Sequence, residues 1–327
     1  MAPLRRYNMP QIDFICPVCD SALEEHERGY RCPTCLRLYR RFSVDGVDVV
    51  DFSSLDSRQC ECNRDGITRC SIDLESQLAQ VMLHRTPARN GHRLTRTQRL
   101  VATETGTGHS ILDLGCGEGR SSALYARGND VYGYDICPKR MLLNEENALD
   151  KGYRALVVGN AIGLPFREAS FDVVVCMEVI EHVTETRQLA AEINRVLKPG
   201  GKLLLSTPNL VGLWNRLGMV LGKGLKASPF SLLRGGGLYP LSPWREGGID
   251  GKRCGFDSVR YPEQPLHVRF FTFESLRDFL GQTGFDVTTE LGVGLVSPMA
   301  DRVLCRVLKN WTDDMVVVAV KKAPARG

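Results

Sequence analysis

A glycine-rich turn after an apolar strand is the first place where residue types and spacing point to chemistry. Residues 111–119 read Ile-Leu-Asp-Leu-Gly-Cys-Gly-Glu-Gly. Gly115, Gly117 and Gly119 alternate with other residues, so the backbone can adopt positive φ and approach a bound molecule more closely than a Cβ atom would allow. A helix is expected directly after them. The turn therefore predicts a site for a nucleotide-type ligand.

A second apolar strand, residues 131–135, ends on Asp135 about twenty residues after the glycines, where a carboxylate can accept hydrogen bonds from both ribose hydroxyls. A nicotinamide dehydrogenase would share these two features. Its GxGxxG turn, however, aims a helix N-terminus at a pyrophosphate. Asp113 and Glu118 would repel a pyrophosphate, whereas they favour a cationic ligand.

Polar residues also follow two later strands. Asn160 comes after the strand expected near 154–158, where its amide could bind an adenine edge. Glu178, Glu181 and His182 follow the strand near 171–176 at i, i+3 and i+4, so one helical turn could present all three. His182 is favoured as a general base because imidazole titrates near neutral pH. The alternative is a histidine that is satisfied by backbone at the start of a helix.

A second candidate base is His267, in the segment His-Val-Arg-Phe-Phe-Thr that ends at Thr272. Arg269 beside it could hold an anionic group of a substrate. Thr272 is expected to cap a helix that runs to Gln282.

Taken together, residues 109–209 resemble a class I S-adenosylmethionine-dependent methyltransferase. The resemblance implies that Asp113 and the glycines surround the methionine part of the donor, and that Asp135 holds its ribose. Asn160 stands where the family often has Asp, and its amide oxygen can still accept a hydrogen bond from the adenine amino group. The residues expected to bind S-adenosylmethionine are Asp113, Gly115, Gly117, Asp135, Ile136, Asn160, Ala161 and Glu178.

The run Met-Glu-Val-Ile-Glu-His-Val at 177–183 is similar to one in ubiquinone-biosynthesis O-methyltransferases. In those enzymes the matching acids and histidine have been linked to a divalent cation, which at Glu178, Glu181 and His182 would lower the pKa of a substrate hydroxyl. Many relatives share the run without a metal. His182, His267 and Glu181 are the expected catalytic residues.

The expected reaction is methyl transfer to an oxygen or carbon of a small or lipid-linked molecule. Nucleobase amino-group methyltransferases usually have an Asn/Asp-Pro-Pro-Tyr/Phe run where this chain has Cys176-Met-Glu-Val, so adenine N6 methylation is not expected. An RNA-directed enzyme of the rRNA guanine type is one alternative. A non-catalytic scaffold that binds the donor is another.

Four of the twelve cysteines form two C-x-x-C pairs, Cys16 with Cys19 and Cys32 with Cys35. This spacing predicts a structural Zn²⁺ site, because four thiolates leave no open coordination position. Residues 13–52 also resemble the zinc-ribbon modules found in front of some rRNA guanine methyltransferases and in small methyltransferase-activating proteins. That resemblance implies either contact with RNA or support of the catalytic domain.

Other polar clusters are less specific. Cys60, Cys62 and Cys70 fit no four-ligand pattern and are expected to be surface thiols in a reducing compartment. Arg93, Arg96 and Arg99 would form a short basic edge on a helix beginning near residue 92, which is expected to be solvated. RNA or another phosphate-bearing substrate is the alternative partner for that edge.

These residues require a scaffold of alternating strands and helices. Strands expected near 110–114, 130–135, 154–158, 171–176 and 201–206, with helices between them, predict a Rossmann-like α/β fold. The resemblance implies seven mostly parallel strands with helices on both faces, the last two near 285–290 and 315–320. The expected domains are a zinc ribbon at 1–52, a linker and helical segment at 53–108, and a methyltransferase domain at 109–327.

A glycine-rich insertion at about 211–265 is expected to act as a lid, with a peripheral membrane contact as an alternative because residues 213–221 are partly amphipathic. The net charge of +4 is too small to argue for nucleic acid by itself. A cytoplasmic location is expected, since no stretch approaches 18 apolar residues and the N-terminus has no signal-peptide core.

Overall fold

The computed structural model describes residues 13–27, 29–44, 47–52, 96–117, 119, 121–126, 128–136, 141, 153–220, 269–294 and 307–323. Several positions singled out above lie outside these ranges: Cys60, Cys62, Cys70, Arg93, Glu118, His267 and the part of the insertion from 221 onward.

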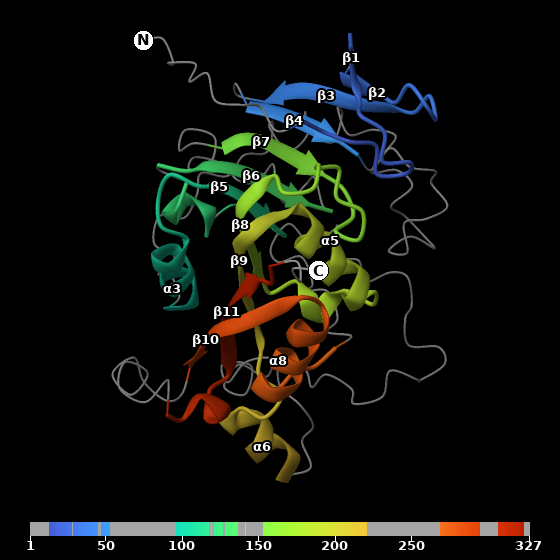
Figure 1. The fold of residues 1–327 in the computed structure, drawn as a ribbon. Coiled ribbons are helices and arrows are strands. Elements are labelled where there is room, and N and C mark those ends of the chain that lie inside the picture. Colours follow the sequence, from blue (N-terminus) through green and yellow to red (C-terminus); the bar gives the residue numbers. More distant parts are fainter. Residues whose placement is uncertain are drawn as a thin grey trace, which may run out of the picture.

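One continuous sheet organises the described residues (Figure 1). Its strand order is β1-β2-β3-β4-β7-β6-β5-β8-β9-β11-β10. The strands of its larger part are β5 (Ser110–Leu114), β6 (Asp130–Asp135), β7 (Tyr153–Val158), β8 (Phe171–Met177), β9 (Leu197–Pro208), β10 (Phe285–Val293) and β11 (Asp314–Lys321).

The pairing within this larger part confirms the expected fold class. Strands β7, β6, β5, β8 and β9 pair with one another in parallel, and β11 is antiparallel to both β9 and β10. These seven strands make the Rossmann-like sheet. The strands are apolar on both faces because both faces are covered.

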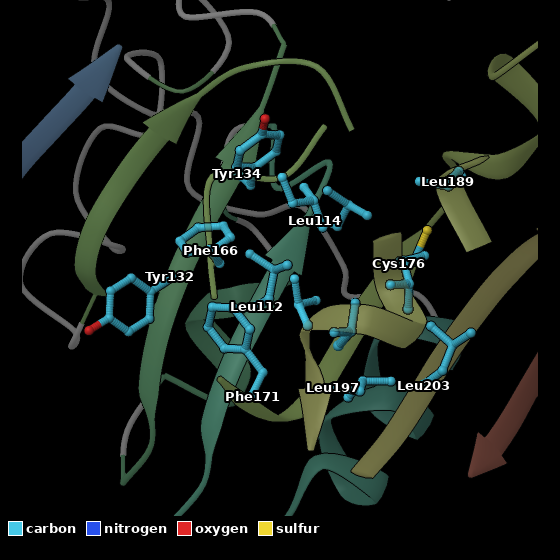
Figure 2. Packing of buried hydrophobic residues seen from close by; sticks show 14 of the residues in the cluster. Leu112, Leu114, Tyr132, Tyr134, Phe166, Phe171, Cys176, Leu189, Leu197 and Leu203 are labelled. Carbon is cyan, nitrogen blue, oxygen red and sulfur yellow. The ribbon is translucent and has the colours of Figure 1, made fainter. Parts of the chain in front are cut away.

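Two layers of side chains cover the two faces. Leu112 and Leu114 of β5 pack with Phe166, Phe171 and other residues on one face, as Figure 2 shows. Ile111 lies in the cluster on the other face, since successive side chains of a strand point to opposite sides.

Helices complete these layers. α5 (Thr186–Val196) and α8 (Phe273–Gln282) contribute to the first cluster, and α3 (Arg96–Thr105) contributes to the second. Thr272 caps α8 as expected, because its hydroxyl accepts a hydrogen bond from the Ser275 N–H at 3.1 Å. α6 (Leu213–Val220) follows β9. No helix within the described ranges is long and apolar enough to cross a membrane.

The described residues include three short 3₁₀ helices between strands: η1 (Ser122–Leu124), η2 (Ile180–His182) and η3 (Lys309–Trp311). Between the glycine turn and β6, the only helical segment among the described residues is η1, so the α-helix expected there is not seen in them. The basic helix α3 is described from Arg96 onward, and its expected start near residue 92 lies outside the described residues.

The N-terminal residues extend the same sheet. β1 (Glu24–His26), β2 (Gly29–Arg31), β3 (Leu38–Val44) and β4 (Val47–Asp51) pair antiparallel in chain order. β4 then pairs in parallel with β7, so the module at 13–52 is hydrogen-bonded to the seven-stranded part (Figure 1). The sequence did not reveal this contact. The division of the chain into separate domains stays a prediction.

Candidate functional site

The polar residues predicted for the site lie in the last residues of β5 and β6 or directly after β7 and β8, at the carboxyl edge of the parallel strands. The chain passes outward from β5 to β6 and β7, and then returns to place β8 on the other side of β5. Open α/β sheets bind ligands at such a switch point, because the loops diverge there and leave a crevice.

The glycine turn is tied to the neighbouring strand by three backbone N–H groups. Those of Gly115 and Cys116 donate to the carbonyl of Tyr134 at 2.7 and 3.1 Å. The N–H of Gly117 donates to Oδ2 of Asp135 at 2.9 Å. Gly115 and Gly117 have φ values of 77° and 49°, so the conformation that the sequence predicted for glycine is present.

Gly115 and Gly117 differ in how closely other atoms approach them. A Cβ on Gly115 would lie 2.3 Å from Cγ2 of Val179, which means that the turn packs tightly against the segment after β8. A Cβ on Gly117 would meet no atom of the described residues within 4 Å. As far as the structure describes the chain, the turn is therefore open beside Gly117.

Two acids lie beside this turn, and both are buried. Asp135 ends β6 and is 7% exposed, and the next residue, Ile136, is 55% exposed. Asp113 is 4% exposed, accepts a hydrogen bond from the Ser122 hydroxyl, and lies 3.4 Å from the Tyr153 hydroxyl. Burial raises the pKa of Asp113 to about 6. A cation beside Asp113 would relieve the cost of keeping this carboxylate charged.

Asn160 and Ala161 follow β7 as expected for an adenine-binding loop. The Asn160 carbonyl accepts a hydrogen bond from the Tyr134 hydroxyl at 3.0 Å. Its side-chain oxygen accepts one from the Ile162 N–H at 3.2 Å, which is a local turn, and the residue is exposed. The loop is thus anchored through its backbone, while the amide of Asn160 is near the surface.

The acids after β8 do not share one helical turn. Glu178 precedes η2 and has a φ of 54°, and its Oε1 accepts a hydrogen bond from the Ser206 hydroxyl at 2.7 Å. Glu181 is inside η2 and 1% exposed. The backbone at Glu178 thus leaves the helical region, yet the carboxyl groups of Glu178 and Glu181 still interact, and desolvation together with this neighbour raises the pKa of Glu178 to about 8.

Glu181 and His182 do lie close together. Oε2 of Glu181 accepts a hydrogen bond from the Thr207 hydroxyl at 3.0 Å, and burial raises the pKa of Glu181. Its Oε1 has no hydrogen-bond partner among the described residues and lies 3.8 Å from Nε2 of His182. A buried carboxylate oxygen beside an imidazole can orient the ring and stabilise its protonated form.

Thr207 and Ser206 were not singled out from the sequence. The available signal was a change from Leu203–Leu205 to polar residues at the end of an apolar strand. The structure also brings Arg269 to this place, because its N–H donates to the Glu181 carbonyl at 3.1 Å. The segment that contains Arg269 thus runs beside η2.

The four cysteines of the N-terminal module gather as predicted. Their sulfur atoms all lie within 4.8 Å of one another. The Sγ atoms of Cys16 and Cys35 are 3.5 Å apart and those of Cys19 and Cys32 are 3.4 Å apart. These distances are too long for disulfides and approach the roughly 3.8 Å edge of a tetrahedron with Zn–S bonds of about 2.3 Å. The donor set therefore fits a Zn²⁺ ion.

This is the only cluster of three or more metal-ligand side chains in the part of the chain that the structure describes. Glu178, Glu181 and His182 do not form one there, so the geometry gives no support to a divalent cation at these residues.

Part of the chain is similar to known methyltransferases. Residues 112–205 match a family model described as a methyltransferase domain. The chain is 36% identical over 107 residues to a ubiquinone biosynthesis O-methyltransferase of Idiomarina loihiensis, covering 31% of this chain and 43% of that relative. It is 26% identical over 227 residues to the uncharacterized protein MJ1252 of Methanocaldococcus jannaschii, covering 68% and 80%.

Among solved structures, the chain is similar to an S-adenosylmethionine-dependent methyltransferase from Mesorhizobium loti, with 17% identity, coverage of 69% of this chain and 98% of that chain, and a TM-score of 0.46. The topology, the glycine turn and the family match together show that this chain contains a methyltransferase domain of the S-adenosylmethionine-dependent class. The chain spans less than half the length of the ubiquinone biosynthesis relative that it matches.

Proposed function

We propose that this chain is an S-adenosylmethionine-dependent methyltransferase that acts on an oxygen or carbon atom of a small or lipid-linked acceptor. The observation that carries the proposal is the unit formed by the glycine turn and Asp135, with open space beside Gly117. A buried acid at the end of the second parallel strand suits a ribose, and the buried Asp113 suits a cationic ligand.

Each part of the donor has a matching group in the chain. Asp135 would accept hydrogen bonds from the ribose hydroxyls, with Ile136 against the adenine. Asn160 and Ala161 would line the adenine edge, and the turn at Gly115 and Gly117 would leave room for the methionine part, with Asp113 providing a negative charge. When bound, the donor supplies an electrophilic methyl group.

The acceptor side is formed by the residues after β8 and β9. His182 would remove a proton from an acceptor hydroxyl or carbon acid, and Glu181 at 3.8 Å would hold the resulting imidazolium. Glu178, expected on the donor side, is a further carboxyl group at the same edge, and desolvation raises its pKa to about 8. His267 remains a second candidate base on the sequence argument alone.

One observation supports an oxygen acceptor, and another supports a lipid-linked acceptor. The Idiomarina loihiensis relative is named as an O-methyltransferase. In this chain, α6 follows β9 at the carboxyl edge and exposes Leu217, Met219 and Val220, the last of them 83% exposed. An apolar surface there suits a peripheral membrane contact that would present a lipid-linked acceptor to the site.

For the N-terminal module, we propose that the four cysteines bind one structural Zn²⁺. Four sulfur ligands close the coordination sphere, so the ion would hold the two knuckles together rather than take part in the reaction. The buried side chains around it, among them Tyr30, Tyr39 and Phe52, belong to the same apolar cluster as the core of the larger sheet, so metal binding would add to the stability that this shared core provides.

The test follows the methyl group. The protein is incubated with donor carrying a labelled methyl group and with a cell extract, and the label is then counted separately in organic-soluble, small polar and RNA fractions. Label in the organic-soluble or small polar fraction is expected, and it should be absent with an Asp135→Ala variant. Label in RNA alone would replace the proposed acceptor class, and no transfer together with tight donor binding would favour a scaffold.

A further inference from the structure

We infer that the metal site controls the affinity of the donor site, because the first cysteine knuckle holds the adenine-side loop (residues 159–166) in place. This inference rests on the proposed function of that loop. It concerns two sites that are separate in the sequence, one at Cys16–Cys35 and the other around Asp135 and Asn160.

The residues around the first knuckle contact the adenine-side loop directly. The N–H of Ile15 donates a hydrogen bond to the Pro165 carbonyl at 3.0 Å, and Phe14 forms an antiparallel bridge with Phe166. Pro17, inside the Cys16–Cys19 pair, lies 3.9 Å from the position of a Cβ on Gly163. The backbone of the knuckle therefore lies against the loop over several residues.

Aromatic side chains connect the sulfur ligands to the same loop. The Tyr39 hydroxyl lies 3.1 Å from the Sγ of Cys16, and its ring is 4.7 Å from that of Phe52. Phe14 contacts both Phe52 at 5.3 Å and Phe166 at 5.6 Å between ring centroids. All four rings are at most 7% exposed, so the chain of contacts from a ligand to the loop is closed to water.

The sheet provides a second connection. β4 pairs in parallel with β7, and the Phe52 N–H donates to the Val158 carbonyl at 2.8 Å. Val158 is also the register partner of Asp135 on β6. β7 thus lies between the metal module and the ribose acid, and the loop begins where β7 ends.

Loss of the metal would weaken both connections. Without the ion, the four cysteines would be joined only by weak thiol hydrogen bonds, so the two knuckles would be held together less firmly. If β4 and Phe14 then separate, β7 becomes an edge strand and the loop loses the surface against which it packs. Because metal and donor both favour the docked loop, their affinities are coupled, and the coupling must be reciprocal.

The experiment measures binding of S-adenosylhomocysteine, the demethylated donor, by calorimetry to the full chain with and without Zn²⁺ under reducing conditions. We expect metal removal to raise the dissociation constant about tenfold, within the usual range of such couplings, and added Zn²⁺ to restore it. Saturating S-adenosylhomocysteine should raise the affinity for Zn²⁺ by the same factor.

A Phe14→Ala variant separates the coupling from folding. It is expected to retain one Zn²⁺ but to bind S-adenosylhomocysteine as weakly as the metal-free wild type, with faster amide exchange at residues 159–166. Val18→Ala is the matched control, because Val18 is in the same knuckle and 49% exposed. Exchange protection in β10 and β11, at the far end of the sheet, reports whether the rest of the chain stays folded.

The possible outcomes distinguish failure of the coupling from failure of the proposed donor site. Equal affinity for S-adenosylhomocysteine with and without Zn²⁺, or wild-type affinity of zinc-loaded Phe14→Ala, would overturn the coupling. Failure of the zinc-loaded wild type to bind S-adenosylhomocysteine would instead overturn the proposed donor site. If metal removal unfolds the whole chain, the zinc-loaded Phe14→Ala protein still decides the question.

Discussion

The backbone N–H of Gly117 and the carboxylate of Asp135 are joined by a 2.9 Å hydrogen bond, so the glycine turn after β5 and the acid that ends β6 form one structural unit. A carboxylate held in this way has a fixed direction for its remaining lone pairs. Preorganisation of this kind favours binding, because less freedom is lost when a ligand arrives.

Substitution of Asp135 should therefore weaken donor binding strongly. Asp135→Ala removes the charged acceptor for the ribose, and hydrogen bonds to charged groups contribute roughly 1.5–3 kcal/mol each. We expect the dissociation constant of S-adenosylmethionine in calorimetry to rise by about 10- to 100-fold. Asp135→Asn, which keeps one acceptor oxygen, should give a smaller loss. Unchanged affinity in both variants would mean that the donor does not use this acid.

The glycine turn allows a test that separates stability from binding. Gly115→Ala would strain a φ of 77° and press against Val179, so the free energy of unfolding should fall by roughly 2–4 kcal/mol in urea denaturation. Gly117→Ala would strain a φ of 49° in open space and cost about 1 kcal/mol, yet reduce donor affinity because its methyl group enters the ligand space.

Val179→Ala provides the control for the overlap at Gly115. In a double-mutant cycle, it should recover about 1–2 kcal/mol of the loss in Gly115→Ala, since the nearest atom is removed. The same change should recover nothing in Gly117→Ala. Additive effects at both glycines would show that the contact with Val179 does not determine the cost.

Some of the features behind these predictions could be predicted from the sequence, and others could not. The glycine turn and Asp135 were predictable because a strand end with that spacing requires particular backbone conformations. The gathering of Cys16, Cys19, Cys32 and Cys35 was predictable because each C-x-x-C pair forms a local turn. In both cases short-range geometry fixes the chemistry.

Long-range pairings were not predictable. Nothing in the composition of β4 specifies β7 as its partner, because apolar strands of similar length are interchangeable until the whole sheet is assembled. The positive φ of Glu178 is also invisible in the sequence, since glutamate gives no signal for that conformation. The spacing of Glu178 and Glu181 therefore predicted that their carboxyl groups lie close together, but not the backbone conformation that places them there.

The metal site can be probed through Tyr39, whose hydroxyl lies 3.1 Å from the Sγ of Cys16. Tyr39→Phe keeps the ring packed against Phe52 and removes only this polar contact. Loss of such an outer partner typically lowers metal affinity 10- to 100-fold, and we expect a change of about tenfold in competition with a chromophoric chelator. Leu38→Ala, a neighbouring and more exposed position, should leave the affinity near that of the wild type.

Asp113 should make stability depend on pH. Burial raises the pKa of its carboxyl from 3.8 to about 6, so the folded state binds the proton more tightly than the unfolded state does. The folded state thus loses stability as pH rises from about 3.8 to 6, and the loss is complete above that window. Asp113→Asn should therefore gain stability relative to the wild type at pH 7 and not at pH 3.5, as measured by urea denaturation at both values. If the two proteins differed equally in their free energy of unfolding at both pH values, the raised pKa of Asp113 would be contradicted.

The same raised pKa predicts that protons are released when the donor binds. A cationic ligand near Asp113 favours the charged carboxylate and lowers its pKa. At pH 6, where about half of the Asp113 carboxyls carry a proton, S-adenosylmethionine should release a fraction of a proton on binding, and at pH 8 it should release almost none. The release is measured by calorimetry in buffers of different ionisation enthalpy. Asp113→Asn should abolish this release at pH 6, and S-adenosylhomocysteine, which lacks the sulfonium charge, should release less than the donor. Equal release in the wild type and the variant would place the cationic part of the donor away from Asp113.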